Sequence, residues 1–351
     1  MSDLRIGGVP VGARHRPFIV AEMSGNHNQS LDRALAITEA AAKAGAHALK
    51  LQTFTPDALT LNLRTRQFVI EDESLWKGEA LYDLYARAVT PWEWHEPIMK
   101  RAKALGLVCF SSPFDEAAVD FLETLDVPAY KIASFENVHL PLIRKVASTG
   151  KPVLISTGMA TRTELEEAVA EARAAGARDI VLLKCTSAYP APPQDANVLT
   201  IPHMRELFGC EVGLSDHTMG IGVAVAAVAL GATVIEKHFT LRRSEGGVDA
   251  AFSLEPEELA ALAAESERAW QALGTVQYGA TETEKASLKE RRSLYIERDM
   301  KAGEVLTTEN LRCIRPGFGL APKYYHVLLG QRVKQPVEKG TPMSWEVVQH
   351  P

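Results

Sequence analysis

Residues 180–238 of the chain read IVLLKCTSAYPAPPQDANVLTIPHMRELFGCEVGLSDHTMGIGVAVAAVALGATVIEKH. Three apolar runs in this stretch, at 180–183, 211–214 and 233–235, are each short enough for one buried strand, and longer segments separate them. Strands that alternate with helices are typical of a parallel sheet, because the chain needs a crossover to return to the same edge. Polar residues follow each run at once, in the letters KCTS, SDH and EKH.

The same alternation extends towards the N-terminus. Further strands are predicted at 18–21, 48–51, 108–110, 129–132 and 153–155. Helical patterns lie between them, as at 31–44 and 164–175, and several end in a glycine that can cap a helix. Eight such units favour a (β/α)8 TIM barrel over an open sheet, and a helix at 256–273 would complete the outer ring. The predicted fold class is therefore α/β.

Two regions differ from a minimal barrel. The connection at 53–90 is too long for an ordinary strand-to-helix loop and is rich in aromatic residues, so it could form a lid or an extra packing layer. After Gly274 the sequence becomes polar and then reads as short strands and turns. We therefore predict a barrel domain at 1–274, a linker at 275–288 and a small β-rich domain at 289–351.

Composition places the chain among folded proteins. It has 351 residues, a formal net charge of −6 and 46% hydrophobic residues, so it can bury a large core. Its four cysteines show no CxxC spacing, which indicates reduced thiols and favours a cytoplasmic location. The N-terminal segment has no signal-peptide core, because Gly, Pro and Arg interrupt its apolar stretches.

Partners other than small molecules are not indicated. Residues 218–235 carry no charge and reach the lower length limit of a membrane span, but three glycines interrupt them, so we expect a buried helix and strand instead of a membrane contact. No GxGxxG, GxxxxGKS or GxSxG motif occurs, and no nucleic-acid motif is recognisable. Residues 289–351 are basic and the remainder is acidic, which could help hold an anionic ligand or could be uneven composition alone.

Polar residues gather where each predicted strand ends, which is the catalytic end of a barrel of this type. Lysines beside several hydroxyl groups indicate a phosphate or carboxylate ligand. These strand-end residues are Glu22, Lys50, Gln52, Ser111, Ser112, Lys131, Ser134, Glu136, Ser156, Lys184, Ser187, Tyr189, Ser215, His217, Glu236, Lys237 and His238.

Three of these residues have specific chemical possibilities. His217 and His238 would end neighbouring strands about 4.8 Å apart, where two imidazoles can bind one metal ion and leave positions open for substrate. A single histidine at such a point is more often a structural residue. Glu22 could be a general base, or a buried carboxylate paired with Lys50.

The motifs at these positions resemble the sialic acid synthase family. The matching segments run from about residue 18 to residue 348 and include AEMSGNHNQ, KLQTFTPD, FSSPFD, YKIASFE, STGMA, KCTSAYPAP, GLSDHT, IEKHFTL, GGVDAAFSLEP and IRPGFGLAP. The segments LYDLY and TPWEWH favour the pseudaminic branch of that family. The resemblance implies a barrel followed by an antifreeze-like (SAF) domain.

The resemblance also implies a transferase reaction in carbohydrate biosynthesis, for example for flagellin glycosylation. Phosphoenolpyruvate condenses with an open-chain aldose to give a nine-carbon 2-keto acid and phosphate. In the pseudaminic branch the sugar is 2,4-diacetamido-2,4,6-trideoxy-L-altrose. Synthesis of legionaminic or N-acetylneuraminic acid, with the same chemistry and another sugar, stays open.

Site roles follow from the same resemblance, residue by residue. Glu22 matches a carboxylate at the reacting centre, and His217 and His238 match ligands of a divalent ion, most often Mn²⁺, with Mg²⁺ or Co²⁺ as alternatives. Phosphoenolpyruvate is assigned to Lys50, Lys131, Ser134, Ser156, Ser187, Ser215 and either Ser111 or Ser112, with Ser112 preferred. The sugar is assigned to Gln52, Glu136, Tyr189 and Asp249. Arg315 matches an arginine that the C-terminal domain offers to the partner's active site in a homodimer.

Two other classes remain open from the residues alone. A Schiff-base aldolase could use Lys50, Lys131, Lys184 or Lys237, and it would need no metal and release no phosphate. A non-enzymatic binding protein could act through its C-terminal module, but that leaves the paired histidines at the barrel mouth without a purpose.

Overall fold

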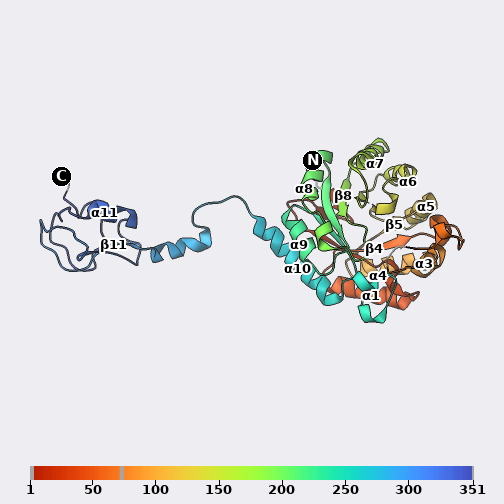
Figure 1. Cartoon of the computed structure of the whole chain (residues 1–351), viewed down its shortest axis with the longest axis horizontal. Helices are drawn as coiled ribbons and strands as arrows, with labels where there is room; N and C mark the ends of the chain where they lie inside the picture. The colour runs from red at the N-terminus through yellow and green to blue at the C-terminus, as the bar shows by residue number, and fades with distance from the viewer. Residues whose placement is uncertain (1–3, 72–74, 350–351) are drawn as a thin grey trace. The chain divides into compact units, whose positions relative to one another are not determined.

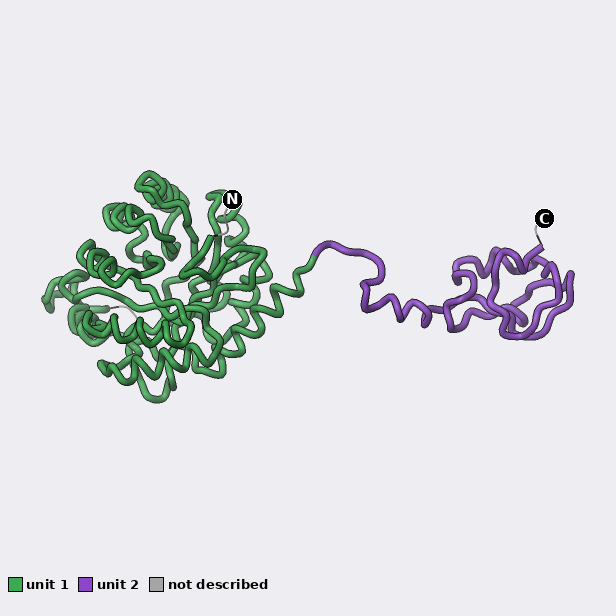
Figure 2. Tube along the Cα trace, turned by 180° about the vertical axis from the view of Figure 1, so that it is seen from behind, with its two compact units in different colours: residues 1–274 green, residues 275–351 purple. Residues whose placement is uncertain are grey.

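The computed structural model describes residues 4–71 and 75–349. The chain divides into two compact units, Met1–Gly274 and Thr275–Pro351, which Figure 2 shows in separate colours. Each unit has its own hydrophobic core, and each is described here by itself.

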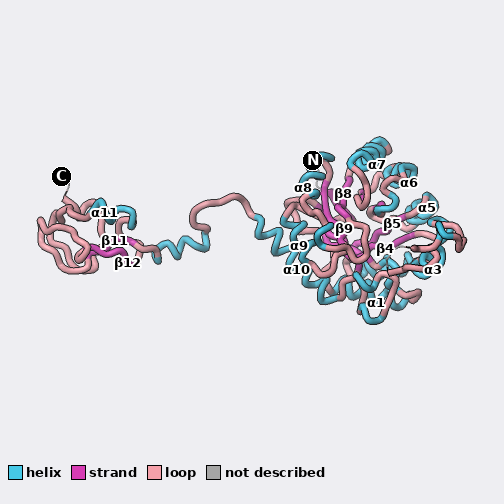
Figure 3. Tube along the Cα trace, viewed as in Figure 1, coloured by secondary structure: helices cyan, strands magenta, loops and turns pink. Residues whose placement is uncertain are grey.

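Unit 1 is a closed barrel of eight parallel strands in the order β10-β3-β4-β5-β6-β7-β8-β9 (Figures 1 and 3). This confirms the predicted α/β class and the TIM barrel. The strands are β3 (Phe18–Glu22), β4 (Ala48–Thr53), β5 (Val108–Pro113), β6 (Tyr130–Ile132), β7 (Val153–Ser156), β8 (Ile180–Cys185), β9 (Glu211–Asp216) and β10 (Val234–His238). Several run further towards their polar ends than predicted, so Gln52 and Ser112 lie within strands.

Helices follow the strands and form the outer layer of unit 1 (Figure 3). They are α1 (Leu31–Lys43), α4 (His95–Ala104), α5 (Glu116–Thr124), α6 (Leu140–Ala147), α7 (Arg162–Ala174), α8 (Thr200–Phe208), α9 (Gly222–Ala229) and α10 (Pro256–Leu273). The last of these has the predicted bounds and packs against both α9 and α1, which closes the ring. A cluster of buried aliphatic residues fills the space between sheet and helices.

The N-terminal end of the barrel is covered by a hairpin that the sequence analysis did not predict. It consists of β1 (Leu4–Ile6) and β2 (Val9–Val11). Leu4, Ile6 and Val11 pack with inward-facing residues near the strand starts, including Phe18 and Val108. Because this end is filled with apolar side chains, polar groups inside the barrel can collect only at the opposite end.

The long connection after β4 contains two short helices, α2 (Pro56–Leu59) and α3 (Leu81–Ala88), and two 3-10 turns, η2 (Arg66–Phe68) and η3 (Trp92–Trp94). Residues 72–74 of this connection lie outside the described residues. Phe54 is buried and contacts Tyr85 and Phe114, so part of the connection is a packing layer on the barrel.

Unit 2 is small and has little regular structure. The two-stranded ladder of β11 (Ser293–Ile296) and β12 (Leu311–Ile314) is accompanied by helix α11 (Tyr325–Leu328) and the turns η8 (Glu282–Glu290) and η9 (Pro322–Tyr324). Isolated bridges join the remaining segments, for example Met300 with Val337. Residues 275–288, predicted as a linker, include most of η8.

The uncharged run at 218–235 forms helix α9 and the start of strand β10. The strand is buried as predicted, whereas in the helix only Ala224, Ala227 and Val228 are buried. Among the described residues, every helix is too short or too polar to cross a bilayer.

Candidate active site

Strand register brings the predicted site residues together at the C-terminal end of the barrel. Glu22 on β3 pairs with Lys50 on β4 and with His238 on β10. Side chains alternate along a strand, so the inward row of β10 carries Glu236 and His238, whereas Lys237 faces the helices. Ionisable side chains of neighbouring strands therefore lie close together inside the C-terminal end of the barrel.

Two lysines and two glutamates form the centre of this cluster. Lys50 Nζ lies 3.1 Å from Glu22 Oε2 and 3.1 Å from Glu236 Oε1. Lys131 Nζ lies 3.7 Å from Glu236 Oε1 and donates a hydrogen bond of 2.6 Å to Ser156 Oγ. All four charged side chains are buried. Removing charges from water is costly, so such a cluster is stable only because its members neutralise one another.

The two carboxylates at the centre differ in charge state. Burial raises the pKa of Glu22, and the neighbouring Glu236 raises it further, against the effect of Lys50. Burial also acts on Glu236, but Lys131 and Lys50 together outweigh it and lower the pKa of Glu236. Glu236 therefore stays ionised between two cations, whereas Glu22 holds a proton more readily than an exposed glutamate does.

Hydrogen bonds orient Glu22 and the anion side of the site. Gln52 Nε2 donates to Glu22 Oε1 at 2.8 Å and lies 3.1 Å from Ser24 Oγ. Lys50 Nζ lies 3.3 Å from Ser112 Oγ. Ser111 Oγ instead contacts Thr53 Oγ1 at 2.6 Å on the outer face of the sheet. Of the two serines considered from the sequence, the inner one is thus Ser112.

Hydroxyl groups surround the loop that follows β7. The Gly158 N–H donates to Ser134 Oγ at 3.2 Å, and Asn137 Nδ2 donates to the carbonyls of Ser156 and Gly158. A Cβ added to Gly158 would lie 2.3 Å from Ser187 Oγ and 2.6 Å from Ser134 Oγ. Because position 158 carries no side chain, these two hydroxyls and the Lys131–Ser156 pair can face a common space that suits an anion.

The two histidines lie side by side at the ends of β9 and β10. Their ring centroids are 5.3 Å apart, and both side chains are buried. His217 Nδ1 donates to the Thr186 carbonyl at 2.9 Å, so the neutral form of this ring carries its lone pair on Nε2. His238 Nδ1 has no hydrogen-bond partner within the described part of the chain and lies 3.5 Å from Asp249 Oδ2.

The chemistry of this donor set fits a divalent cation. Burial and the neighbouring positive groups hold the pKa of His238 well below its usual value, so its imidazole is neutral and can act as a ligand. The carbonyl bond to His217 Nδ1 is the usual outer contact of a metal-binding histidine. No cluster of three or more His, Cys, Asp or Glu with metal-site geometry occurs among the described residues. Two imidazoles would leave positions open.

Aromatic rings form the other wall of the site. The Tyr189 ring lies 4.5 Å from the ring of His217 and 5.2 Å from that of Phe252, and Phe252 lies 4.9 Å from His238. From the long connection, the Trp76 ring reaches Tyr189 at 5.8 Å. Part of this connection therefore borders the site, so the connection is both a packing layer and a wall of the barrel mouth.

Glu136 completes the site near its rim. It lies on the turn η4 (Ser134–Glu136), and its buried Oε2 has no hydrogen-bond partner among residues 4–71 and 75–349. Burial raises the pKa of Glu136 to about 7, although Lys131 and Lys50 favour its charged form. This carboxyl group is therefore able to gain or lose a proton in the neutral range.

Behind the histidines, an outward-facing ion pair fixes the two strand ends. Lys237 Nζ lies 3.0 Å from Asp216 Oδ2 and also donates to the carbonyls of Thr218 and Gly220. Asp216 Oδ1 in turn accepts from the Thr218 N–H at 2.9 Å. His217 and His238 directly follow Asp216 and Lys237, so this pair ties down the segment that carries each histidine.

The structure thus gathers at a single barrel mouth the unit 1 residues that were assigned to phosphoenolpyruvate, the sugar and the metal, with Ser112 and not Ser111 as the inner serine. Ser215 Oγ lies 3.4 Å from Glu236 Oε1 and belongs to the same cluster. Arg315 is exposed in unit 2, directly after β12. The sequence analysis named Glu236 as a strand-end residue but missed its position between the two lysines, and it did not single out Ser24 or Gly158. Because side chains alternate along a strand, Glu236 lies on the same inward face of β10 as His238. This spacing of two residues was the sequence signal that Glu236 faces the site.

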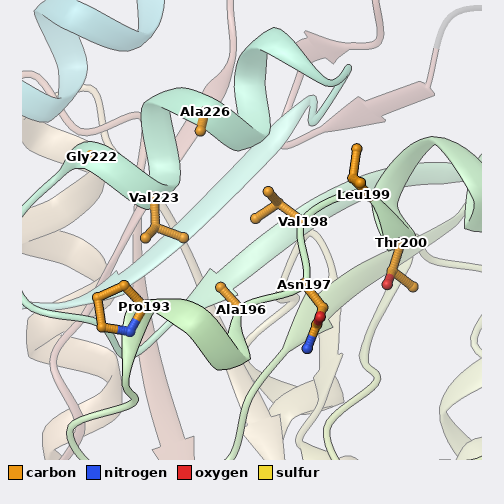
Figure 4. Close-up of a pocket in the computed structure, with 9 residues that line it drawn as sticks. All are labelled: Pro193, Ala196, Asn197, Val198, Leu199, Thr200, Gly222, Val223 and Ala226. Carbon is orange, nitrogen blue, oxygen red and sulfur yellow. The ribbon is translucent and has the colours of Figure 1, made fainter.

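A separate cavity of about 430 Å³ lies outside this cluster, between η5 (Pro193–Asp195), the start of α8 and α9 (Figure 4). No acidic or basic side chain lines it among the described residues, and Leu199 at its edge is exposed. It offers no group for acid–base chemistry and is not part of the site.

With this geometry established, comparison with known proteins identifies the family. Residues 37–278 match the NeuB family, and residues 291–349 match the SAF domain. The chain belongs to the NeuB family.

Two curated relatives and one solved structure illustrate the match. The chain is 45% identical over 326 residues to pseudaminic acid synthase from Campylobacter jejuni (strain 81-176), covering 92% of this chain and 94% of that protein. It is 34% identical over 354 residues to N,N'-diacetyllegionaminic acid synthase from Legionella pneumophila, covering 99% of each. The crystal structure of N-acetylneuraminic acid synthetase from Leptospira borgpetersenii, in complex with citrate, has a TM-score of 0.73 at 29% identity and covers 82% of this chain and 95% of that chain.

These matches confirm the predicted resemblance, the SAF domain and the expectation of an enzyme. The roles assigned to individual residues remain predictions.

Proposed function

We propose that this NeuB-family enzyme condenses phosphoenolpyruvate with open-chain 2,4-diacetamido-2,4,6-trideoxy-L-altrose and water to give pseudaminic acid and phosphate. The observation that carries this proposal is that a pair of buried lysines and a pair of histidines lie close together in one barrel mouth. Lys50 and Lys131 form an anion site around Glu236, and the His217–His238 pair lies on the neighbouring strand ends.

The anion site would bind phosphoenolpyruvate. Its phosphate and carboxylate groups need fixed cations and hydroxyl donors, which Lys50, Lys131 and the serines around Gly158 supply. Hydrogen bonds to neighbouring residues already fix these side chains, so they would lose little conformational freedom when the anion binds.

The chemistry then follows from the atoms available. C3 of phosphoenolpyruvate attacks the aldehyde carbon of the sugar, a C–C bond forms, and the aldehyde oxygen becomes a hydroxyl by taking up a proton. Water adds at C2 while Glu22, whose pKa is raised by burial, accepts its proton. The C2–O bond breaks, phosphate leaves, and a 2-keto group remains.

A divalent cation, Mn²⁺ by preference and Mg²⁺ or Co²⁺ as alternatives, would be held by His217 and His238 with Asp249 nearby. When bound there, it polarises the aldehyde carbonyl as a Lewis acid. Tyr189, Gln52 and Glu136 would orient the sugar beside it.

The choice of sugar rests on the relatives. Identity is 45% to the C. jejuni pseudaminic acid synthase and 34% to the L. pneumophila N,N'-diacetyllegionaminic acid synthase. The LYDLY and TPWEWH segments, which form α3 and the turn before α4, favour the same branch. We further place the enzyme in the cytoplasm, consistent with four free cysteines.

We also propose a homodimer in which Arg315 of one protomer completes the site of the other. The support is the exposure of Arg315 on unit 2 and the match of that unit to the SAF domain. The excess of basic residues in 289–351 suits contact with an anionic substrate.

A Schiff-base aldolase is the second candidate, and one observation favours it. Burial lowers the pKa of Lys131, as an amine nucleophile requires. Lys50 does not suit this role, because Glu22 and Glu236 outweigh its burial and raise its pKa. Lys237 faces away from the site and donates to three acceptors.

The test is phosphate release from phosphoenolpyruvate with the diacetamido-altrose, the legionaminic precursor sugar or N-acetylmannosamine. We expect release to be fastest with the first sugar and to stop when the metal is chelated. Activity in metal-stripped enzyme, or an adduct trapped on Lys131 by borohydride, would favour the aldolase.

A further inference from the structure

A cavity of about 560 Å³ adjoins the sugar side of the active site. Three segments line it: the loop after β3 with Asn28 and Gln29, the long connection with Trp76 and Arg87, and the loop after β10 with Val248 and Ala251. None of these residues belongs to the cluster that would bind phosphoenolpyruvate or the metal.

Trp76 joins this cavity to the histidine pair. Its Nε1 donates to the Val248 carbonyl at 3.1 Å, and its ring lies 5.8 Å from Tyr189, which contacts His217. Asp249 follows Val248 directly and lies 3.5 Å from His238. Two residues beside the histidine pair are therefore connected to the lining of the cavity: Tyr189 through its ring contact with Trp76, and Asp249 through its peptide bond to Val248.

The lining is polar but carries no net charge among the described residues. Its two ionised groups, Arg87 and Glu79, form an ion pair with each other. Asn28 Nδ2 donates to the Gly246 carbonyl at 3.2 Å, and Gln29 Nε2 donates to the Arg87 and Val89 carbonyls, so both amide groups are held in place. A second anion or a cation would have no counter-charge here.

An amide oxygen lies on one side of the cavity. A Cβ added to the lining residue Gly247 would lie 2.9 Å from Oδ1 of Asn28, which also lines the cavity. Apolar surface from Leu75, Trp76 and Ala251 lies in the same lining. A hydrogen-bond acceptor beside apolar surface suits a small neutral group that has one N–H and one methyl group.

We infer that this cavity receives an acylamino group on the part of the sugar remote from its aldehyde. This inference rests on the proposed function, which fixes the aldehyde between the histidines and the anion site. With phosphoenolpyruvate on the lysine side, the remaining sugar carbons extend along Tyr189 towards Trp76. The cavity is then a specificity site that favours a sugar with a 4-acetamido group over one with a 4-hydroxyl.

The test fills the cavity from two of its three lining segments, with Ala251→Trp and with Leu75→Trp. The matched control is Leu199→Trp, which adds an indole at the other cavity, away from the site. Steady-state rates are measured with the 2,4-diacetamido sugar and with an analogue that has a hydroxyl at C4. KM for phosphoenolpyruvate and thermal melting are followed in parallel.

We expect each filled variant to lose about tenfold or more in kcat/KM for the diacetamido sugar, through KM, with KM for phosphoenolpyruvate unchanged. The 4-hydroxyl analogue should lose less than about threefold, because it has no group for the cavity. The control should match the wild type. If one variant does not fold, the other carries the test.

Equal losses for both sugars, an equal rise in KM for phosphoenolpyruvate, or no loss at all in a folded variant would overturn the inference. Failure of the proposed function would give a different result, because the wild-type enzyme would then release no phosphate with either sugar. That result would also remove the basis of the role assigned to the cavity.

Discussion

Glu22 is the residue on which the proposed chemistry depends most. It is fully buried, accepts a hydrogen bond from Gln52, and has a raised pKa because of its burial. Glu22→Gln keeps the shape and the contact with Gln52 but removes the base. We expect turnover to fall by about 10² or more while phosphoenolpyruvate binds almost as in the wild type.

Calorimetric titration of phosphoenolpyruvate and steady-state rates of Glu22→Gln make this measurement. Glu211→Gln, at the opposite end of the barrel where Glu211 pairs with Arg205, is the control and should leave turnover unchanged. Weaker binding with little change in turnover would show that Glu22 only positions Lys50.

Glu136 makes a pH-dependent contribution to stability whose sign can be worked out. Its pKa is raised from 4.5 to about 7 by burial, so between these values the folded state holds a proton that the unfolded state has released. Stability therefore falls as pH rises through this window and is constant above it. Glu136→Gln lacks this dependence. Its free energy of unfolding, relative to that of the wild type, should therefore rise by up to about 3 kcal/mol between pH 4.5 and 7.

Chemical denaturation of both proteins at several pH values makes this measurement. All other titrating groups are shared, so they cancel in the difference between the two. A difference that stays constant with pH, or one that grows in the opposite direction, would show that Glu136 does not have a raised pKa.

At the scale of elements, the loop after β7 would set the shape of the proposed anion site. Gly158 does not need the left-handed region, so alanine is compatible with its backbone, but the added methyl group would meet the hydroxyls of Ser134 and Ser187. We expect Gly158→Ala to raise KM for phosphoenolpyruvate about tenfold or more, with a smaller effect on KM for the sugar.

Gly222→Ala is the matched control, because a Cβ at the start of α9 meets nothing within 4 Å. It should leave both KM values unchanged. A Gly158→Ala enzyme with normal affinity for phosphoenolpyruvate would mean that this loop does not contact the anion.

The strands of the barrel were predictable because each one has a recognisable local sequence pattern. Each is an apolar run with polar residues at its end, and β3, β4 and β10 then place Glu22, Lys50 and His238 side by side through register alone. The hairpin β1–β2 was missed because three-residue strands lie below the length at which periodicity is visible. The period-two pattern of β10 shows that Glu236 faces inward with His238. Its contacts with Lys50 and Lys131, like the role of Gly158, depend on strands distant in sequence, which no local pattern encodes.

At the scale of the whole molecule, the proposed dimer divides each active site between two chains. Unit 1 has its own closed core, so residues 1–274 alone should fold but be inactive. An Arg315→Ala chain mixed with a His238→Ala chain should regain activity, because mixed dimers contain one site with an intact barrel and an intact arginine. Random mixing predicts up to about a quarter of the wild-type activity.

The control is each variant alone, with exchange of chains verified by native mass spectrometry. Mixed dimers without any regained activity would mean that Arg315 acts within its own chain or not at all.

The most direct measurement of the chemistry uses phosphoenolpyruvate labelled with ¹⁸O in the oxygen that joins C2 to phosphorus. Addition of water at C2 beside Glu22, followed by C–O cleavage, sends this oxygen into the released phosphate. We predict labelled phosphate, formed in equal amount with a nine-carbon 2-keto acid and only when the sugar is present. Unlabelled phosphate, with ¹⁸O left on the keto acid, or phosphate released without sugar, would contradict the proposed reaction.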